Sequence, residues 1–600
     1  MEQPAIKDYA IIGDCRTAAL VSRDGSIDWL CLPDFSSPSV FARLIDEEGG
    51  YFAIRPRDIC TVKRRYIGST AVLETTFETS TGVLRLVDLF PIVDGATSLA
   101  PMRELLRITE CVSGSIELEI IFNAQPNYRR TPIRMSYRCG FGWRGDWANE
   151  LIVLNTKAEL VPSGTGLSGN MCLRTGERQH FSLAYVRGDV ASVAPLGLEA
   201  DERCEHTTTW WRNWTLQCSF DGRERDSVLR SAVTLKLLTS CLSGALIAAP
   251  TTSLPEAIGA KRNWDYRYCW MRDAGLAMNA FIGLGFHAEA EAYLNWLLHA
   301  TRLTWPRLNL VYDTYGRTHL REQKLAHLSG YRHSQPVRIG NNAVDQLQLD
   351  AYGQVIVAAD AFASGGQELD ATEQRMLRGF GDVICKIWRE PDNGIWEIAD
   401  RRRQYTLSKM LCWVALDRLL SLEKRGIIKL KRRCELFARE CEAIGRCIEE
   451  HGFNSQIDSY TGVLDGQEVD AGLLLMVCVA YKNATDPRAI STYARIQRDL
   501  SRTGLLYRYR PGSDGMAGEE GAFGICGFWA VDHLAERGQI EEAERYFDHL
   551  VSFANDVGLF AEEIDPGTGA ALGNFPQAFT HVGLIYAALS LRKARRKRAA

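Results

Sequence analysis

The sequence has no excess of basic residues and no long hydrophobic run. Its 600 residues carry a formal net charge of −4. Proteins that bind nucleic acids neutralise phosphates with clustered Lys and Arg, so this balance argues against a nucleic-acid partner. No stretch of about 18 apolar residues occurs, which is roughly the length that a membrane-crossing helix needs. The sequence therefore predicts neither a nucleic-acid nor a membrane partner.

Signals for metal binding and for secretion are missing as well. The 17 cysteines are scattered, with no C-x-x-C pair and no Cys/His cluster at zinc spacing. We therefore expect no metal site and no cofactor. The N-terminus, MEQPAIKDYAIIGD, lacks the charged-then-apolar pattern of a signal segment. Free thiols persist in reducing compartments, so a cytoplasmic location is expected. The sequence leaves the oligomeric state, including a homo-oligomer, open.

The first third of the chain has the pattern of strands. Residues 1–195 contain short segments rich in branched and aromatic residues, separated by Gly, Pro, Ser and Asn. These segments are YFAIRP, AVLETTFET, VLRLVDLFPIV, LLRITECV, IELEIIFNA, LIVLNTKAEL and HFSLAYV. Many short strands with turns between them predict a β-sandwich over 1–195. A linker over 196–224 is expected to be partly helical.

From residue 225 the hydrophobic period is that of helices. Twelve segments follow, at 225–248, 272–284, 288–303, 343–364, 371–390, 406–421, 430–452, 470–481, 487–501, 522–536, 540–555 and 576–593. Alternate connections are short, so the helices pair antiparallel and the longer loops share one end. Those loops are 249–271, 304–342, 391–405, 453–469, 502–521 and 556–575. Six pairs predict a closed (α/α)6 barrel over 225–594, followed by a basic tail, 595–600, that frays from the last helix.

The long loops are rich in aromatic, Arg and carboxylate residues. They include RNWDYRYCWMRDAG, GYRHSQPVRIGNNAVDQLQLD, NGIWEIAD, LYRYRPGSDGMAGEEGAF and GLFAEEIDPGTGAALGNFPQAFTH. Aromatic rings stack on pyranose faces, and Arg and Asp make charge-assisted hydrogen bonds to sugar hydroxyls. Two carboxylates can supply the acid and the base for cleavage of a glycosidic bond. The alternative is that these residues only pack and cap helices; Asp273 could stabilise a helix N-terminus.

These motifs resemble those of a known family. DYAIIGDCRTAALVSRDGSIDWLCLPDFSSPSVFARLID is similar to the opening of bacterial trehalase-like proteins of glycoside hydrolase family 15. RNWDYRYCWMRDA, PVRIGN, DQLQLD, GIWE, SKMLCWVALDR, GEEGAF and LGNFPQA resemble motifs found throughout that family. The resemblance covers nearly the whole chain. It implies a β-sandwich followed by a six-hairpin α/α barrel, and an inverting mechanism for exo-acting α-glucosidases such as trehalases and glucoamylases.

The resemblance also implies the site residues. The general acid of the family lies in a Trp-Glu pair, which matches Trp396 and Glu397. The general base is the first acidic residue of the turn before the last helix, here Glu562, and Glu563 is then a supporting polar group. The implied sugar contacts are Tyr266, Trp270, Arg272, Asp273, Trp396, Arg508, Tyr509 and Glu520, with Glu519 nearby, and the supporting positions are Arg338 and Asn341.

The chain departs from the family pattern in two places. Fungal glucoamylases have a second glutamate directly after the acid, where this chain has Ile398. Many bacterial relatives carry histidines soon after the Trp-Glu pair, where this chain reads RRRQYTLSK. Both departures concern the choice of substrate. We expect burial to favour the neutral form of Glu397, and a polar turn with Asp565 to keep Glu562 ionised.

The resulting hypothesis is an inverting exo-α-glucoside hydrolase that acts on a small carbohydrate, with α,α-trehalose as the first choice of substrate. The similarity of the N-terminal segment to the trehalase-like clade, and a last barrel helix that ends the chain, favour trehalose. A glucoamylase or exo-α-glucosidase acting on short malto- or isomalto-oligosaccharides is the main alternative. An α-glucoside phosphorylase and an inactive sugar-binding protein are more remote, because two suitably placed glutamates are present. A loop of the N-terminal domain is expected to narrow the pocket.

Overall fold

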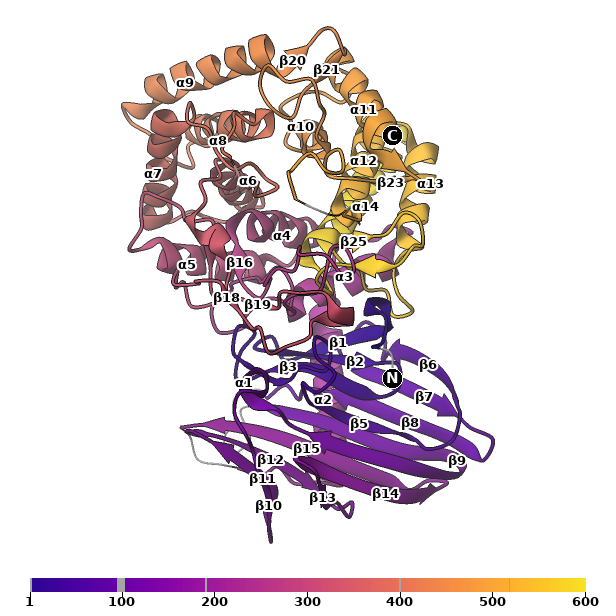
Figure 1. Cartoon of the computed structure of the whole chain (residues 1–600). Helices are drawn as coiled ribbons and strands as arrows, with labels where there is room; N and C mark the ends of the chain where they lie inside the picture. The colour runs from indigo at the N-terminus through magenta and orange to yellow at the C-terminus, as the bar shows by residue number, and fades with distance from the viewer. Residues whose placement is uncertain are drawn as a thin grey trace.

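The structure is a computed structural model that describes residues 3–93, 103–188, 192–398, 401–516, 518 and 520–599. Strands fill the N-terminal part and helices fill the C-terminal part (Figure 1). The two predicted classes of structure are therefore confirmed. None of the described helices combines the length and the apolar character needed to cross a bilayer.

Fifteen strands of the N-terminal part form two joined antiparallel layers. They are β1 (Tyr9–Gly13), β2 (Ala18–Ser22), β3 (Ser26–Cys31), β4 (Ser39–Phe41), β5 (Tyr51–Pro56), β6 (Thr61–Tyr66), β7 (Leu73–Glu78), β8 (Gly82–Leu89), β9 (Glu104–Asn123), β10 (Met135–Arg138), β11 (Gly142–Trp147), β12 (Glu150–Thr156), β13 (Val161–Ser163), β14 (Gly166–Arg174) and β15 (Arg178–Arg187). Two short helices, η1 (Ile6–Asp8) and α1 (Pro126–Arg129), accompany them.

The long strand β9 belongs to both layers. Its first half pairs with β8 and β15, and its second half pairs with β5 and β14. The layers face each other, because the rings of Phe52 and Phe181 lie 6.1 Å apart. Between the layers, the buried Arg107 pairs with Asp88 at 2.7 Å and donates to the carbonyl oxygen of Phe52 at 2.6 Å. The bond from Arg107 to Phe52 and the contact between Phe52 and Phe181 thus connect the two layers, while Asp88 holds Arg107 from the neighbouring strand β8.

The strand predictions differ from the structure in two ways. LLRITECV and IELEIIFNA were expected as two strands, but both lie within β9, which passes through Gly114 with a local shift in register rather than a turn. Strands β1, β2 and β3 were not predicted. Every residue in them is buried, so the alternation that marks a half-exposed strand is absent.

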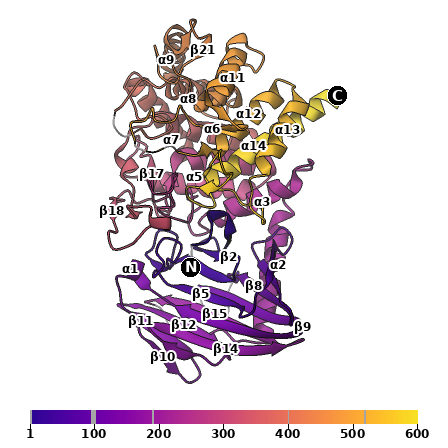
Figure 2. The ribbon, with the colours of Figure 1, turned by 45° about the vertical axis from the view of Figure 1, so that its right-hand side comes forward.

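Helix α2 (Leu198–Thr215) connects the strands to the helices (Figure 2). Arg203 on α2 pairs with Glu104 of β9 at 3.0 Å. Farther along α2, Trp214 stacks on Phe286 with ring centroids 4.2 Å apart and donates to Glu289 at 2.7 Å. The same helix therefore contacts both parts of the chain, as a linker between two packed units must.

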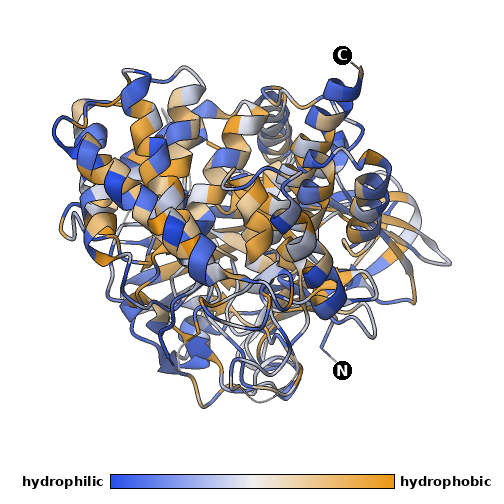
Figure 3. Ribbon diagram, turned by 90° about the horizontal axis from the view of Figure 1, so that it is seen from above, coloured by the Kyte–Doolittle hydropathy of each residue, from blue (hydrophilic) through white to orange (hydrophobic). Residues whose placement is uncertain are grey.

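Each of the twelve predicted helical segments contains a helix among the described residues. These are α3 (Arg225–Leu237), α4 (Met271–Leu284), α5 (His287–Thr301), α6 (Asp350–Ser364), α7 (Ala371–Ile387), α8 (Thr406–Lys424), α9 (Arg433–Cys447), α10 (Leu475–Cys478), α11 (Pro487–Leu500), α12 (Gly524–Glu536), α13 (Ile540–Val551) and α14 (Ala578–Ala599). Figure 3 shows hydrophobic and hydrophilic residues next to each other on many of the helices. The eighth is much shorter than expected, because Ala471–Leu474 forms the 3-10 turn η5 ahead of α10.

The loops contain short elements of their own. These are β16 (Cys269–Trp270), β17 (Val311–Tyr312), β18 (Gln323–Lys324), β19 (Arg338–Ile339), β20 (Phe453–Asn454), β21 (Ser459–Tyr460), β22 (Ser501–Arg502), β23 (Leu505–Leu506), β24 (Ala522–Phe523), β25 (Glu563–Ile564) and β26 (Ala571–Leu572), with η2 (Tyr331–His333), η3 (Asn342–Asp345) and η4 (Ile448–Gly452). Strands β24, β25 and β26 form one small sheet, so the fifth and sixth long loops are hydrogen-bonded to each other.

Alternate helices contact each other in a closed circuit. The order of contact is α4, α6, α8, α10, α12, α14 and back to α4. Helices α5, α9 and α13 each contact the circuit helix that precedes them in the sequence, and α3 contacts α14. Within the circuit nearly all of α12 is buried, whereas α13 buries only one face. An inner and an outer set of helices result, and the loops between them meet at the ends of the inner set.

The end of the chain is ordered differently from the prediction. Residues from 595 onward were expected to fray, but α14 continues through Ala599. The reason is a set of ion pairs: Arg595 contacts Glu224 and Glu544, each at 2.7 Å, and Arg596 contacts Asp221 at 2.8 Å. The basic residues thus match acidic partners on neighbouring elements.

Candidate active site

A cavity of about 910 Å³ opens among the long loops. Residues of the first, second, third and fifth of the predicted long loops line it, together with Gln577 and Phe579 beside the start of α14. Its described lining residues all lie at or after Ala248. The expectation that an N-terminal loop narrows the pocket is therefore wrong for the described part of the chain.

The N-terminal part instead supports the first long loop from behind. Trp29 of β3 donates to the carbonyl oxygen of Pro250 at 2.7 Å. The buried Arg267 pairs with Asp265 at 2.7 Å and donates to the carbonyl oxygen of Ser37 at 2.9 Å. These contacts fix the backbone that carries the motif RNWDYRYCWMRDA.

Glu397, the predicted acid, lies in the third loop, between α7 and α8, and lines the cavity. Its side chain is 25% exposed, and its backbone has a positive φ of 61°. This left-handed conformation is rare for a residue with a side chain. The neighbouring Trp396 is buried and donates to Asp470 at 2.8 Å, and its ring lies 5.4 Å from that of Phe523. Both Trp396 and Glu397 line the cavity, and the hydrogen bond to Asp470 fixes the orientation of the Trp396 ring in its wall.

Arg272 connects Glu397 to the first loop. Its guanidinium donates to Asp273 at 2.8 Å, to the carbonyl oxygen of Ile395 at 2.8 Å and to Glu397 at 3.3 Å. Burial raises the pKa of Glu397, and the positive charge of Arg272 opposes this rise. The pKa of Glu397 is therefore shifted in the predicted direction, toward the neutral acid.

Glu562, the predicted base, is fully buried just behind Tyr266 in the cavity wall. The Tyr266 hydroxyl donates to Glu562 at 2.6 Å, and the backbone N–H of Asn574 donates to it at 3.2 Å. The adjacent Gly573 has a φ of 73°, and a Cβ there would come within 2.4 Å of the Glu562 carboxylate. This position therefore requires glycine for close approach.

The expected environment of Glu562 is wrong. Asp565 turns away and binds Thr568 and the backbone of Gly567, both within its own turn. Glu562 is instead fully buried, and its hydrogen bonds come from Tyr266 and Asn574 rather than from the Asp565 turn. Burial, followed by the negative charge of Glu256, raises its pKa to about 8. Burial also raises the pKa of Glu563, well above that of an ordinary glutamate.

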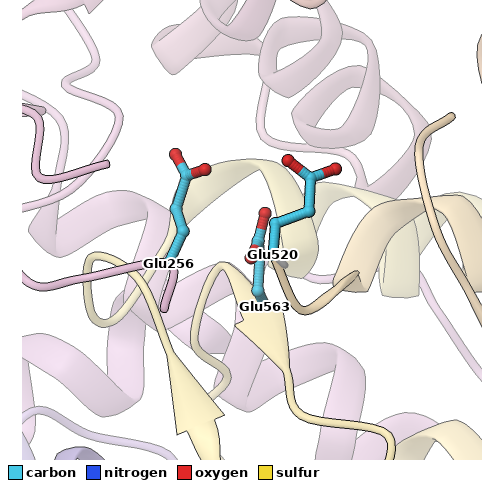
Figure 4. A group of neighbouring side chains, drawn as sticks. All are labelled: Glu256, Glu520 and Glu563. Carbon is cyan, nitrogen blue, oxygen red and sulfur yellow. The ribbon is translucent and has the colours of Figure 1, made fainter. Parts of the chain in front are cut away.

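Glu563 lies on β25 and faces a cluster of carboxylates. Oxygen atoms of Glu256, Glu520 and Glu563 lie within 4.8 Å of one another, and Figure 4 shows the three side chains projecting to the same side. Such a group could hold a cation, but Arg508 already contacts all three, with Glu256 at 2.7 Å, Glu520 at 2.8 Å and Glu563 at 3.5 Å. The guanidinium supplies the positive charge that a metal ion would bring.

The remaining predicted residues fall into the same region. Trp270 lies on β16 with its ring 5.4 Å from that of Tyr266. The Tyr509 hydroxyl donates to Asp514 at 3.2 Å and to Glu520 at 3.3 Å. Glu520, like Glu562 and Glu563, is buried behind the cavity lining, whereas Tyr509 and Arg508 belong to it. Glu519 lies outside the described residues.

Arg338 and Asn341 have supporting positions in the wall of the cavity. Arg338 donates to Glu322 at 3.0 Å and to the carbonyl oxygen of Asn263 at 2.8 Å, with its guanidinium over the Trp264 ring. Asn341 accepts the backbone N–H of Ala343 at 2.9 Å and so caps η3. Both residues organise loops beside the cavity.

Comparison with known proteins agrees with this arrangement. Residues 222–589 match the family described as glycosyl hydrolases family 15, and residues 1–157 match a trehalase-like N-terminal domain. The chain belongs to glycosyl hydrolase family 15. It is therefore a glycoside hydrolase, as the resemblance of its motifs implied.

Relatives of this family-15 chain extend over its full length. A protein named trehalase from Mycolicibacterium smegmatis is 35% identical over 98% of this chain and 92% of its own. Another from Thermoplasma volcanium is 34% identical over 99% of this chain and 95% of its own. A bacterial glucoamylase complexed with acarbose has a TM-score of 0.72, covering 99% of this chain and 94% of its own. At 12% identity, that likeness shows a shared fold alone.

Several residues of this family-15 pocket were not predicted from the sequence. Glu256, Trp264, Arg262, Asp514 and Gln346 line the cavity without having been predicted. Glu256 stands in TTSLPEAIG, a segment with neither aromatic residues nor a helix period. A signal was nevertheless available, because Glu256 lies within the same predicted long loop as RNWDYRYCWMRDA.

Proposed function

We propose that this protein hydrolyses α,α-trehalose to glucose by an inverting mechanism, with Glu397 as general acid and Glu562 as general base. The observation that carries the proposal is the pair of carboxylates at one cavity, one held by Arg272 and the other by Tyr266. Similarity to proteins named trehalase over nearly the whole chain supports the choice of substrate.

In the proposed reaction, the Glu397 carboxylic acid gives its proton to the glycosidic oxygen as the bond between this oxygen and C1 breaks. Glu562 removes a proton from a water molecule, whose oxygen forms the new bond to C1 from the opposite face. Arg272 stays bound to the carboxylate that Glu397 becomes, which stabilises the charge that develops there. Aromatic side chains of the lining, such as Trp270 and Tyr266, offer ring faces for the sugar.

The fold has a finer description that we also propose. The closed circuit of α4, α6, α8, α10, α12 and α14 supports an (α/α)6 barrel over 225–594, and the facing layers joined by β9 support a β-sandwich over 1–195. Helix α2 falls within the linker 196–224. A cytoplasmic location is supported by the cysteines, since all 17 are free thiols.

The test uses the purified chain and early-time proton NMR of the anomers. Hydrolysis of α,α-trehalose with inversion releases one β-glucose and one α-glucose before mutarotation, whereas retention releases two α-glucose molecules. Glucose release from trehalose should exceed release from maltose, isomaltose and maltotriose. A preference for the maltose series would replace trehalase by the glucoamylase alternative.

Two further measurements separate the more remote alternatives. Glucose 1-phosphate formed in the presence of inorganic phosphate would indicate phosphorolysis. Glu397→Gln and Glu562→Gln should each lower the rate by orders of magnitude while the thermal unfolding midpoint stays near that of the unchanged chain. Full activity in either variant would overturn the corresponding assignment.

A further inference from the structure

Glu256 has a place in the site that no comparison assigns to it. It is 1% exposed, yet it contributes to the cavity wall. The loop that carries Glu256 is hydrogen-bonded to the segment that contacts Glu562. The N–H of Gly573 donates to the carbonyl oxygen of Pro255 at 2.8 Å. The N–H of the next residue, Asn574, donates to the Glu562 carboxylate. Glu256 and Glu562 are therefore held side by side by two adjacent residues.

Arg508 is bound to one member of this pair, Glu256, and to Glu520. Its guanidinium donates to Glu256 at 2.7 Å and makes two further bonds to Glu520, at 3.0 and 2.8 Å. Its contact with Glu563 is longer, at 3.5 Å, and no hydrogen bond from it to Glu562 is found among the described residues. Arg508 thus belongs to Glu256 and Glu520 rather than to the proposed base.

The charges around Glu562 do not balance. The carboxyl groups of this cluster are those of Glu256, Glu520, Glu562, Glu563 and Asp514. Its cations are Arg262 and Arg508, and its phenols are Tyr266 and Tyr509; Glu397 lines the same cavity. Five carboxyl groups face two guanidinium groups. Because nearly all of them are buried, full ionisation would leave an uncompensated negative charge, so the cluster retains protons at neutral pH.

We propose that Glu256 is a positioning residue that makes Glu562 a stronger base, by keeping Arg508 engaged with Glu520 and by placing a second negative charge beside it. This inference rests on the proposed role of Glu562. A base whose proton affinity is near the working pH removes a proton from water more readily than an ordinary glutamate does. The negative charge of Glu256 raises the pKa of both Glu562 and Glu563, and burial is the only larger cause of the rise.

The test is the pH dependence of kcat/KM for trehalose, from about pH 4 to about pH 9, in Glu256→Gln. The profile yields two apparent pKa values, and their sum does not depend on which value belongs to which group. Removal of the neighbouring like charge should lower this sum by about one unit or more. A residue with only a packing role would change the height of the profile and leave the sum unchanged.

Two control variants accompany this measurement. Glu322→Gln neutralises another carboxylate in the wall of the same cavity, one that pairs with Arg338 at 3.0 Å, and should leave the sum unchanged. Glu256→Asp keeps the charge but withdraws it by one methylene, so the sum should fall by less than in Glu256→Gln. If Glu256→Gln fails to fold, Glu256→Asp decides, because the direction of its shift is the same.

The outcomes separate the two proposals. An unchanged sum in Glu256→Gln, or in Glu256→Asp where only that variant folds, overturns the role of Glu256 while leaving the catalytic pair intact. Wild-type activity in Glu562→Gln overturns the proposed base itself, whatever the Glu256 variants do. A shift of equal size in Glu322→Gln would show a general effect of cavity charge and would also overturn the specific role of Glu256.

Discussion

The hydroxyl of Tyr266 offers the sharpest test of how Glu562 is controlled. It donates a 2.6 Å hydrogen bond to a carboxylate that is fully buried and that, within the described part of the chain, has one other donor, the backbone N–H of Asn574. This hydrogen bond favours the ionised form of Glu562 and so lowers its pKa. Tyr266→Phe removes the oxygen and keeps the ring, so it changes this one interaction.

The size of the effect follows from the energy of the bond. A hydrogen bond to a charged group contributes about 1.5–3 kcal/mol. Since about 1.4 kcal/mol corresponds to one pKa unit, the loss should raise the pKa of Glu562 by about one to two units. With a starting pKa of about 8, roughly a tenth of Glu562 is ionised at pH 7, and a rise of one unit leaves about a hundredth. We therefore expect kcat/KM at pH 7 to fall about tenfold to a hundredfold.

The assay is kcat/KM for trehalose as a function of pH, and the sign of the change is part of the prediction. Because the variant holds its proton more tightly, its deficit should shrink as the pH rises. Tyr293→Phe is a matched control, since Tyr293 on α5 is a buried tyrosine whose hydroxyl has no hydrogen-bond partner in the described structure. Wild-type kcat/KM at pH 7 in Tyr266→Phe, or a deficit that grows with pH, would refute the reasoning.

Three further predictions concern other groups. The pH optimum of a bell-shaped profile lies midway between its two pKa values. With the pKa of Glu562 at about 8 and that of Glu397 raised above 4.5, we expect the optimum above about pH 6, measured from initial rates in a buffer series. Glu563→Gln should lose less than tenfold in kcat, far less than Glu562→Gln, because a glutamine resembles the neutral acid that the raised pKa favours at Glu563; equal losses would reverse their roles. Asp88→Ala leaves the buried Arg107 without its partner and should lower the free energy of unfolding in urea by about 3–5 kcal/mol.

Much of the architecture could be predicted from hydrophobic periodicity. Segment 51–56 matches β5, and each of the twelve helical segments contains a helix. The pattern is clearest in outer helices such as α13, because they bury one face only. The strands β1, β2 and β3 could not be predicted in this way, since both of their faces are buried. The ordered end of α14 depends on partners such as Glu224, more than 350 residues away in the sequence.

The candidate site was predictable in its residues but not in its electrostatics. Motifs identified the residues that meet at the cavity, including Tyr266, Arg272 and Glu397. The pKa of Glu562 depends on burial and on Glu256, and neither can be read from the glutamate pair at 562 and 563. The local sequence suggested Asp565 as the charged neighbour of Glu562. In the structure that neighbour is Glu256, which precedes Glu562 by 306 residues in the sequence.

The left-handed backbone of Glu397 has a consequence for how this protein can evolve. A residue with a side chain in this conformation costs about 1–3 kcal/mol relative to an ordinary one, and a glycine would relieve most of that cost. Selection for thermal robustness alone would therefore favour glycine at position 397, and selection for turnover would oppose it because we propose Glu397 as the general acid. A library of variants sorted only by survival after heating should become enriched in catalytically dead chains changed at this position, so screens for a more durable enzyme need an activity step in every round.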